Sequence, residues 1–177
     1  VGLNKRSSIL LQDYRDVNEQ FDAIVSIEMI EAVGKAYWEA FFEMIKKSLK
    51  PNGRAVIQAI TINDSLADEY QTGVDFIQKY IFPGGILMSQ SQFKNLAAKY
   101  KFNILDRHDF GDDYAWTLLE WFKRFQTQWI KIEALGFSMQ FKKMWEFYLS
   151  YCRSGFLNGD INVVQYTLCH YPQKAPT

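Results

Sequence analysis

Cysteine is scarce in this sequence, with only Cys152 and Cys169 among 177 residues. Their spacing matches no metal-ligand pattern, and two cysteines do not make the disulfide framework of a small secreted domain. A reducing compartment suits such a chain. We therefore expect a cytoplasmic protein that holds no metal ion.

Long hydrophobic runs are also missing. The longest apolar stretches cover residues 24–33 and 54–62, whereas a membrane-spanning helix needs about 20 consecutive apolar residues. No segment has the layout of a signal peptide. We therefore expect any membrane contact to be peripheral, at the inner face of the membrane.

Neither sign of charge is in excess, because 20 lysines and arginines balance 20 aspartates and glutamates. Proteins that bind nucleic acid through its phosphates usually carry a positive surplus. Nucleic acid is therefore not an expected partner.

Aromatic residues, by contrast, are abundant: the chain has 14 phenylalanines, 10 tyrosines and 5 tryptophans. This is more ring surface than a core of this size usually needs, and it suits a pocket for apolar or cationic ligands. A core rich in aromatic residues explains the composition equally well.

The length fits one domain that spans residues 1–177. Apolar runs typical of buried strands alternate with apolar stripes at helical spacing, which predicts an α/β sheet with crossover helices. Expected strands cover residues 8–11, 21–27, 54–62, 102–107 and 161–168. Expected helices cover residues 35–50, 118–129 and 141–152, with a further short helix capped by Ser91.

Residues 63–90 show no clean period and contain the turn signal Pro83-Gly84-Gly85. Long connections of this kind usually serve ligands. We expect this insertion to line the substrate site, with residues 80–85 beside the substrate.

Polar residues follow the first three expected strands, where the ligands of open α/β sheets bind. Gln58 stands out because it interrupts an apolar run, and a buried amide costs about 1–3 kcal/mol unless it is hydrogen-bonded. It therefore has either a structural partner or a ligand. The candidates at the strand ends are Gln12, Asp13, Tyr14, Ser26, Glu28, Glu31, Gln58, Ile60 and Thr61.

Several of these candidates have a structural alternative. Asp13 fits a turn on a solvated loop. Glu31 fits the positive start of a helix. Tyr114, which follows Asp112 and Asp113, fits a partly exposed loop tyrosine.

Six motifs occur in order along the chain: LQDYRD, FDAIVSIEMIEAVG, LKPNG, QKYIFPGG, FGDDY and GDINVVQYTL. Together they resemble the cyclopropane fatty acid synthase and mycolic acid methyltransferase family over nearly the whole chain. The resemblance implies a class I, Rossmann-like methyltransferase fold with helices on both faces of the sheet, which binds S-adenosylmethionine and an unsaturated fatty acyl or phospholipid substrate. It also implies transfer of a methyl or methylene group to the double bond through a carbocation, with bicarbonate as the base.

The resemblance assigns roles to single positions. Glu31 and Tyr114 match the carboxylate and the hydroxyl that hold bicarbonate, and Gln58 stands at a further position of that site. Ile60 and Glu28 match positions that contribute backbone groups, so we expect Glu31 to be essential and Glu28 to tolerate substitution. The positions that match the cofactor site are Gln12, Asp13, Tyr14, Ser26 and Ile27.

Two positions depart from the family pattern. Ala32 and Gln58 stand where the family usually has histidine. An amide can donate a hydrogen bond to bicarbonate but cannot accept a proton, so a cyclopropane ring and a methyl branch both stay open as products. Two other interpretations also stay open: a small-molecule N-methyltransferase and a catalytically inactive, lipid-binding relative.

The family's glycine-rich cofactor loop and the amino-terminal strands lie upstream of the position that matches Val1. The backbone N–H groups of such a loop receive the cofactor's carboxylate. We therefore expect the carboxy-terminal part of a methyltransferase domain, inactive on its own. An uncovered sheet edge also favours pairing with a second copy, so a homodimer is an expected assembly.

Overall fold

The computed structural model describes residues 7–171. Its centre is a sheet in the order β1-β2-β5-β4, and the short β3 pairs with the end of β2. β1 and β3 run parallel to β2, whereas β5 is antiparallel to both of its neighbours. Four of the five expected strands are thereby confirmed. The strands are β1 (Phe21–Ile27), β2 (Leu49–Ile62), β3 (Met88–Ser89), β4 (Phe102–Asp109) and β5 (Ile161–His170).

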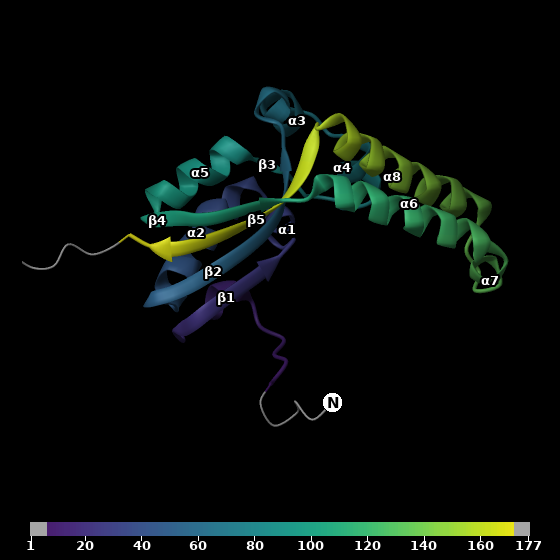
Figure 1. Cartoon of the computed structure of the whole chain (residues 1–177). Helices are drawn as coiled ribbons and strands as arrows, with labels where there is room; N and C mark the ends of the chain where they lie inside the picture. Colours follow the sequence, from purple (N-terminus) through teal and green to yellow (C-terminus); the bar gives the residue numbers. More distant parts are fainter. Residues whose placement is uncertain (1–6, 172–177) are drawn as a thin grey trace, which may run out of the picture.

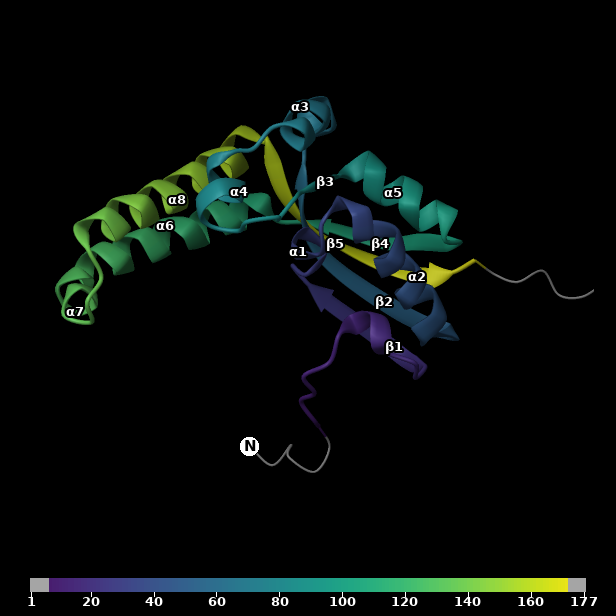
Figure 2. The same cartoon turned by 180° about the vertical axis from the view of Figure 1, so that it is seen from behind.

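Two helices, α2 (Trp38–Ser48) and α5 (Gln90–Lys99), pack on one face of the sheet (Figures 1 and 2). The expected helix over residues 35–50 is split, because η2 (Lys35–Tyr37) is a 3-10 turn and the backbone becomes extended at Leu49. Burying a large apolar side chain contributes about 1.5–3 kcal/mol. This layer is the main core because it holds the larger of the two clusters of buried apolar side chains. Its almost fully buried side chains include Phe41, Phe42, Ile45, Ile57, Ala59, Phe93, Val164, Tyr166 and Leu168.

Tyr166 lies at the centre of this core, and its ring stacks on Phe93 with the ring centroids 3.9 Å apart. Its hydroxyl is buried without a hydrogen-bond partner among residues 7–171, and such an unpaired group costs about 1–3 kcal/mol. We therefore expect Tyr166→Phe to raise the unfolding free energy by about 1 kcal/mol, measured by urea unfolding. Phe93→Ala, the contrasting variant, should lower it by about 3–5 kcal/mol. A clear loss of stability in Tyr166→Phe would contradict this prediction.

A helical hairpin extends from the carboxyl edge of the sheet (Figure 1). α6 (Gly111–Thr127) leaves the sheet, α7 (Trp129–Glu133) lies at the tip, and α8 (Met139–Asn158) returns to β5. The two expected helical stripes are confirmed. No helix in the described range is long and apolar enough to cross a bilayer. The hairpin holds a second core of buried side chains: Ala115, Leu118, Leu149, Phe156 and Val163.

The insertion also lies at the carboxyl edge of the sheet. Its residue Ile86 donates from its backbone N–H to the carbonyl of Glu31 at 2.9 Å. On the other side, Phe76 packs against Phe147 of α8 with ring centroids 4.6 Å apart. Its role toward a substrate stays a prediction. The insertion contains three short helices: η3 (Asp64–Leu66), α3 (Ala67–Thr72) and α4 (Phe76–Tyr80).

Residues 8–11 do not form the expected strand. Ile9 and Leu11 are fully exposed, and the structure describes residues 7–13 as having no regular secondary structure. An apolar run becomes a strand only beside a neighbour that pairs with its backbone groups. No described strand pairs with this segment, which instead leads into η1 (Tyr14–Asp16).

Ser89, and not Ser91 as expected, caps α5. The Ser89 hydroxyl accepts from the backbone N–H of Gln92 at 3.3 Å, and the Gln92 side chain accepts from the N–H of Ser89 at 2.9 Å. This reciprocal pair is a capping box. Ser91 instead donates its hydroxyl to Asp64 at 2.8 Å, which ties the start of α5 to the insertion.

Helices on both faces of the sheet were expected, but α2 and α5 pack on the same face, and the other face carries no α-helix within residues 7–171 (Figures 1 and 2). Val25 and Ile27 of β1 are 66% and 53% exposed. Ile27 is in register with Gln58, and Gln58 is in register with Gln165 of β5. Two amide side chains therefore lie next to each other on the face opposite the main core.

Candidate active site

The five residues expected to be catalytic lie at the carboxyl ends of β1 and β2. Glu28 follows β1 directly, and Glu31 lies in the following short helix. Gln58 and Ile60 belong to β2, and Tyr114 lies in the first turns of α6. Hydrogen bonds join them in two groups, one around Glu28 and one around Glu31. The short helix after β1 is α1 (Ile30–Val33).

Glu28 is the centre of the first group. Its Oε1 accepts from the Tyr114 hydroxyl at 2.6 Å and from Nε2 of Gln58 at 2.8 Å. Its backbone N–H donates to the carbonyl of Gln58 at 2.9 Å. The sequence led us to expect only a backbone contribution from Glu28. The structure corrects this, because the side chain accepts both hydrogen bonds of the group.

The buried Gln58 has a structural partner. Its Oε1 accepts from Nε2 of Gln165 at 2.8 Å, while its own Nε2 donates to Glu28. An ionised carboxylate can only accept hydrogen bonds, so the Gln58 amide must present its nitrogen to Glu28. The hydrogen bond from Gln165 to Oε1 of Gln58 holds the amide in this orientation. Sequence reasoning missed Gln165, although it interrupts the apolar residues Val164 and Tyr166 just as Gln58 interrupts β2.

Glu31 is the centre of the second group. Its Oε1 accepts from the backbone N–H of Ile60 at 2.5 Å, so Ile60 acts through its backbone as expected, but toward Glu31. Oε2 is buried without a partner among the described residues. Burial raises the pKa of Glu31 to about 7, although the hydrogen bond from Ile60 opposes this shift. Near neutral pH this carboxyl can therefore hold or release a proton.

Tyr114 keeps its proton at neutral pH. Burial, followed by the hydrogen bond to Glu28, raises the pKa of Tyr114 above its usual range. Its ring packs between Phe156 and Phe110, with centroid distances of 5.2 and 6.4 Å. Tyr114 is therefore a fixed hydrogen-bond donor on a helix and not a loop tyrosine.

The residues expected to bind the cofactor are only partly brought together. Gln12 donates to the carbonyl of Asp16 at 3.1 Å. Asp13 accepts from Arg15, and hydrogen bonds from Arg15 lower the pKa of Asp13 to about 2. These two side chains are thus satisfied within their own turn, as the alternative for Asp13 predicts. Ile27 is exposed on β1.

Tyr14 and Ser26 fit a cofactor better. Tyr14 packs edge-on against Phe41, with centroids 6.1 Å apart, and lines a shallow hollow of about 310 Å³. The hydroxyl of Ser26 is buried without a described partner. A ring beside a hollow and a free hydroxyl suit an adenosyl group. The hollow is lined by Tyr14, Arg15, Met29, Ala32, Val33 and Tyr37.

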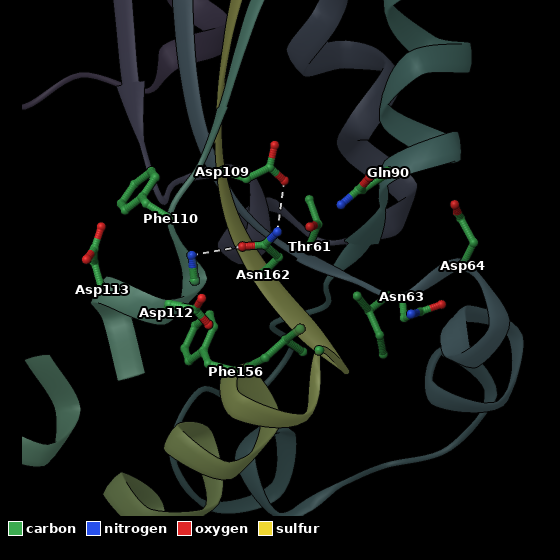
Figure 3. Close-up of a pocket in the computed structure, with 14 residues that line it drawn as sticks. Thr61, Asn63, Asp64, Gln90, Asp109, Phe110, Asp112, Asp113, Phe156 and Asn162 are labelled. Atoms are coloured by element: carbon green, nitrogen blue, oxygen red, sulfur yellow. Dashed lines mark hydrogen bonds between the residues drawn. The ribbon is translucent and has the colours of Figure 1, made fainter. Parts of the chain in front are cut away.

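A second, larger pocket of about 520 Å³ opens where β2, β4 and β5 meet α6 (Figure 3). Asn162 lies at its centre, where it donates to Asp109 at 2.8 Å and accepts from the N–H of Gly111 at 2.9 Å. Sequence reasoning did not find this pocket. Its acidic rim forms no metal site, since no suitable group of three or more ligating side chains occurs in residues 7–171. The acidic lining residues are Asp64, Asp109, Asp112 and Asp113.

Gly111 is required where α6 begins at this pocket. A Cβ at this position would lie 2.5 Å from Oδ1 of Asn162, closer than side chains tolerate. We expect Gly111→Ala to displace Asn162 and to lower the unfolding free energy by about 1–3 kcal/mol, measured by thermal unfolding. Gly136→Ala, at the open tip of the hairpin, is no equivalent control because its φ is +96°. Gly73→Ala, where the nearest atom lies 3.4 Å away, should change stability much less.

Comparisons with known proteins agree with the family resemblance of the sequence motifs. A family model described as mycolic acid cyclopropane synthetase matches residues 1–166. The tuberculostearic acid methyltransferase UfaA1 of Mycobacterium tuberculosis is 39% identical over 168 residues, which cover 94% of this chain and 39% of UfaA1. The cyclopropane-fatty-acyl-phospholipid synthase of Escherichia coli is 41% identical over 159 residues, which cover 89% of this chain and 40% of the synthase. The chain thus spans about two fifths of the length of these relatives.

A solved structure shows the same arrangement of sheet and helices. The crystal structure of mycolic acid cyclopropane synthase CmaA1, complexed with SAH and CTAB, superposes with a TM-score of 0.81 at 27% identity. The match covers 90% of this chain and 59% of CmaA1. The expected class I methyltransferase fold is confirmed. Because the family model spans nearly all of the chain and two relatives share about 40% of its residues, the chain belongs to the mycolic acid cyclopropane synthetase family.

Proposed function

We propose that the protein uses S-adenosylmethionine to transfer a methyl or methylene group to the double bond of an unsaturated fatty acyl chain. The observation that carries this proposal is the convergence of Tyr114 and Gln58 on one carboxylate oxygen beside the buried Glu31. The relatives UfaA1, a tuberculostearic acid methyltransferase, and the E. coli cyclopropane-fatty-acyl-phospholipid synthase support a fatty acyl substrate. SAH in the CmaA1 structure supports the cofactor.

The cofactor would lie at the hollow beside Tyr14. When bound, it supplies an electrophilic methyl group. The chain's own residues then have to orient the alkene toward that methyl and keep water away from the cation that forms on the lipid.

A row of aromatic rings on the hairpin suits the acyl chain. Tyr148, at the end of the row nearest the sheet, also meets Phe82 of the insertion with centroids 6.2 Å apart. Apolar rings exclude water, and their faces stabilise positive charge. We therefore propose that the acyl chain lies along this row with its double bond near Tyr114. The row consists, in order, of Phe137, Phe141, Trp145 and Tyr148, and the centroids of successive rings lie 4.6, 5.6 and 5.0 Å apart.

The tip of the hairpin suits a peripheral contact with the inner face of a membrane. Ile130 and Leu135 are 81% and 78% exposed there, and Lys131 lies beside Ile130. Apolar side chains flanked by lysine favour the boundary between lipid headgroups and acyl chains. Within residues 7–171 no strand pairs with the outer edge of β1, and from this open edge we also propose a homodimer.

A base has to remove a proton after methyl transfer. The family resemblance points to bicarbonate, but the two donors that such an anion would need, Tyr114 and Gln58, both donate to Oε1 of Glu28 in this structure. Gln58 and Ala32, at the positions of the usual histidines, leave both a ring and a methyl branch that keeps a double bond within the proposal.

The proposed function is tested with the gene product that carries this chain. It is incubated with labelled S-adenosylmethionine and phospholipid vesicles whose acyl chains are unsaturated, with saturated vesicles as the control. We expect mass spectrometry to find lipids heavier by one CH₂ unit only with the unsaturated vesicles. A methylated small-molecule amine with no lipid product would contradict the proposal.

A further inference from the structure

The anion position of the active site is filled by a group of the chain itself. Tyr114 and Gln58, the two side chains whose donors were expected to hold bicarbonate, both donate to Oε1 of Glu28 at 2.6 and 2.8 Å. Hydrogen bonds to an ionised carboxylate are short and about twice as strong as those between neutral groups. Bicarbonate would have to displace Glu28 to reach these donors.

The backbone at Glu28 supports a functional role for its side chain. Its φ is +50°, a left-handed conformation that costs a non-glycine residue about 1–2 kcal/mol. Glycine adopts it freely. A glutamate held in this conformation by its surroundings is typical of a functional site.

We propose that the carboxylate of Glu28, and not a bound bicarbonate ion, accepts the proton that leaves the methylated lipid. This inference rests on the proposed function and names the base for it. Gln165 acts as a positioning residue, because it holds the Gln58 amide with its nitrogen toward Glu28.

The proton step balances without a further reactant. With S-adenosylmethionine bound, the two π electrons of the alkene would form the new bond to the methyl carbon, and the C–S bond would break with its electron pair left on sulfur. The adjacent lipid carbon is left with a positive charge. A C–H bond of the new methyl group or of a neighbouring carbon then gives its electron pair to that carbon, which closes a ring or forms a new double bond. The proton moves to the Glu28 carboxylate, and from this half-buried side chain it returns to water.

A saturated branch would need a reductant in addition, so it lies outside this proposal.

Two substitutions of Glu28 distinguish its carboxylate from bicarbonate as the base. Glu28→Gln keeps the shape and accepts the same hydrogen bonds, but it is not basic. Glu28→Gly empties the position and suits the local backbone, so it should fold at least as well as the wild type. Activity is measured on unsaturated vesicles in buffer freed of carbon dioxide, with and without added bicarbonate. Glu43→Gln, an exposed glutamate of α2, is the matched control.

We expect the wild type and Glu43→Gln to be fully active without bicarbonate. Both Glu28 variants should lose about 100-fold or more in kcat under that condition, the usual contribution of a positioned base. Added bicarbonate should restore activity to Glu28→Gly, where space is open for an anion, and not to Glu28→Gln. Melting temperatures confirm that each variant is folded.

Binding of bicarbonate gives a readout that does not depend on turnover. Equilibrium dialysis with labelled bicarbonate should show binding to Glu28→Gly and none to the wild type. A bicarbonate requirement in the wild type, equal binding to both proteins, retained activity in Glu28→Gln, or no rescue of a folded Glu28→Gly would overturn the inference while leaving the proposed function intact. A wild type that makes no methylated lipid even with bicarbonate would overturn both.

Discussion

Glu31→Gln is expected to lower the rate of methyl transfer about 100-fold or more. The glutamine can still accept the hydrogen bond from the N–H of Ile60, so the turn after β1 keeps its geometry. The glutamine cannot hold and release a proton as the Glu31 carboxyl can. In the wild type, Oε2 of Glu31 is buried and has no hydrogen-bond partner among the described residues. The measurement is the initial rate on unsaturated vesicles. Glu43→Gln, an exposed glutamate on α2, should leave this rate unchanged.

The same variant should change how stability depends on pH. Burial raises the pKa of Glu31 from its ordinary value of 4.5 to about 7, so the folded state binds this proton more tightly than the unfolded state. Its contribution to stability is therefore fully present below pH 4.5 and is lost as the pH rises through about 7. Glu31→Gln has no such titration and should exceed the wild type in melting temperature above pH 7. A pH profile that the substitution leaves unchanged would contradict a buried, titrating Glu31.

Tyr114→Phe is expected to lower kcat about 10- to 100-fold while leaving the affinity for S-adenosylmethionine nearly unchanged. The ring keeps its contacts with Phe110 and Phe156, so the start of α6 stays in place. Glu28 loses the shorter of its two hydrogen bonds, and a bond to a charged group contributes about 1.5–3 kcal/mol. The measurements are kcat on unsaturated vesicles and cofactor affinity by calorimetry.

A matched control for this substitution is Tyr171→Phe, since Tyr171 is 41% exposed after β5. It should change neither quantity. If Tyr114→Phe weakened cofactor binding and kcat in parallel, the hydroxyl would act through the cofactor site and not through Glu28.

Most of the fold could be predicted because its strands and helices carry their own periodic patterns. β1 and β5 read as apolar runs, and the hairpin helices read as stripes. Residues 8–11 have the same apolar character, but a strand also needs a partner, and no local pattern shows whether one exists. The cap of α5 was predictable, because Ser89 has a glutamine three residues later and Ser91 does not.

The position of the active site could be predicted from the sequence, but the hydrogen-bond partners within it could not. The strand ends and the family motifs point to Glu28, Glu31, Gln58 and Tyr114, and the structure brings them together. Which side chain meets which depends on the backbone at Glu28, whose positive φ no residue pattern reveals. Gln165 belongs to a strand 107 residues away from Gln58, and only the sheet register shows that they are neighbours.

That register has a consequence for the order in which the protein forms during synthesis. β5 is the last described strand along the chain, yet it lies between β2 and β4 and pairs with both. While the ribosome is still translating the hairpin, β2 and β4 have no strand between them, and each leaves a row of backbone groups unpaired. Gln58 likewise has no Gln165 to orient it. The nascent chain therefore passes through a stage with two open strand edges, at which a chaperone could bind, and the active site is assembled only after β5 has left the ribosome.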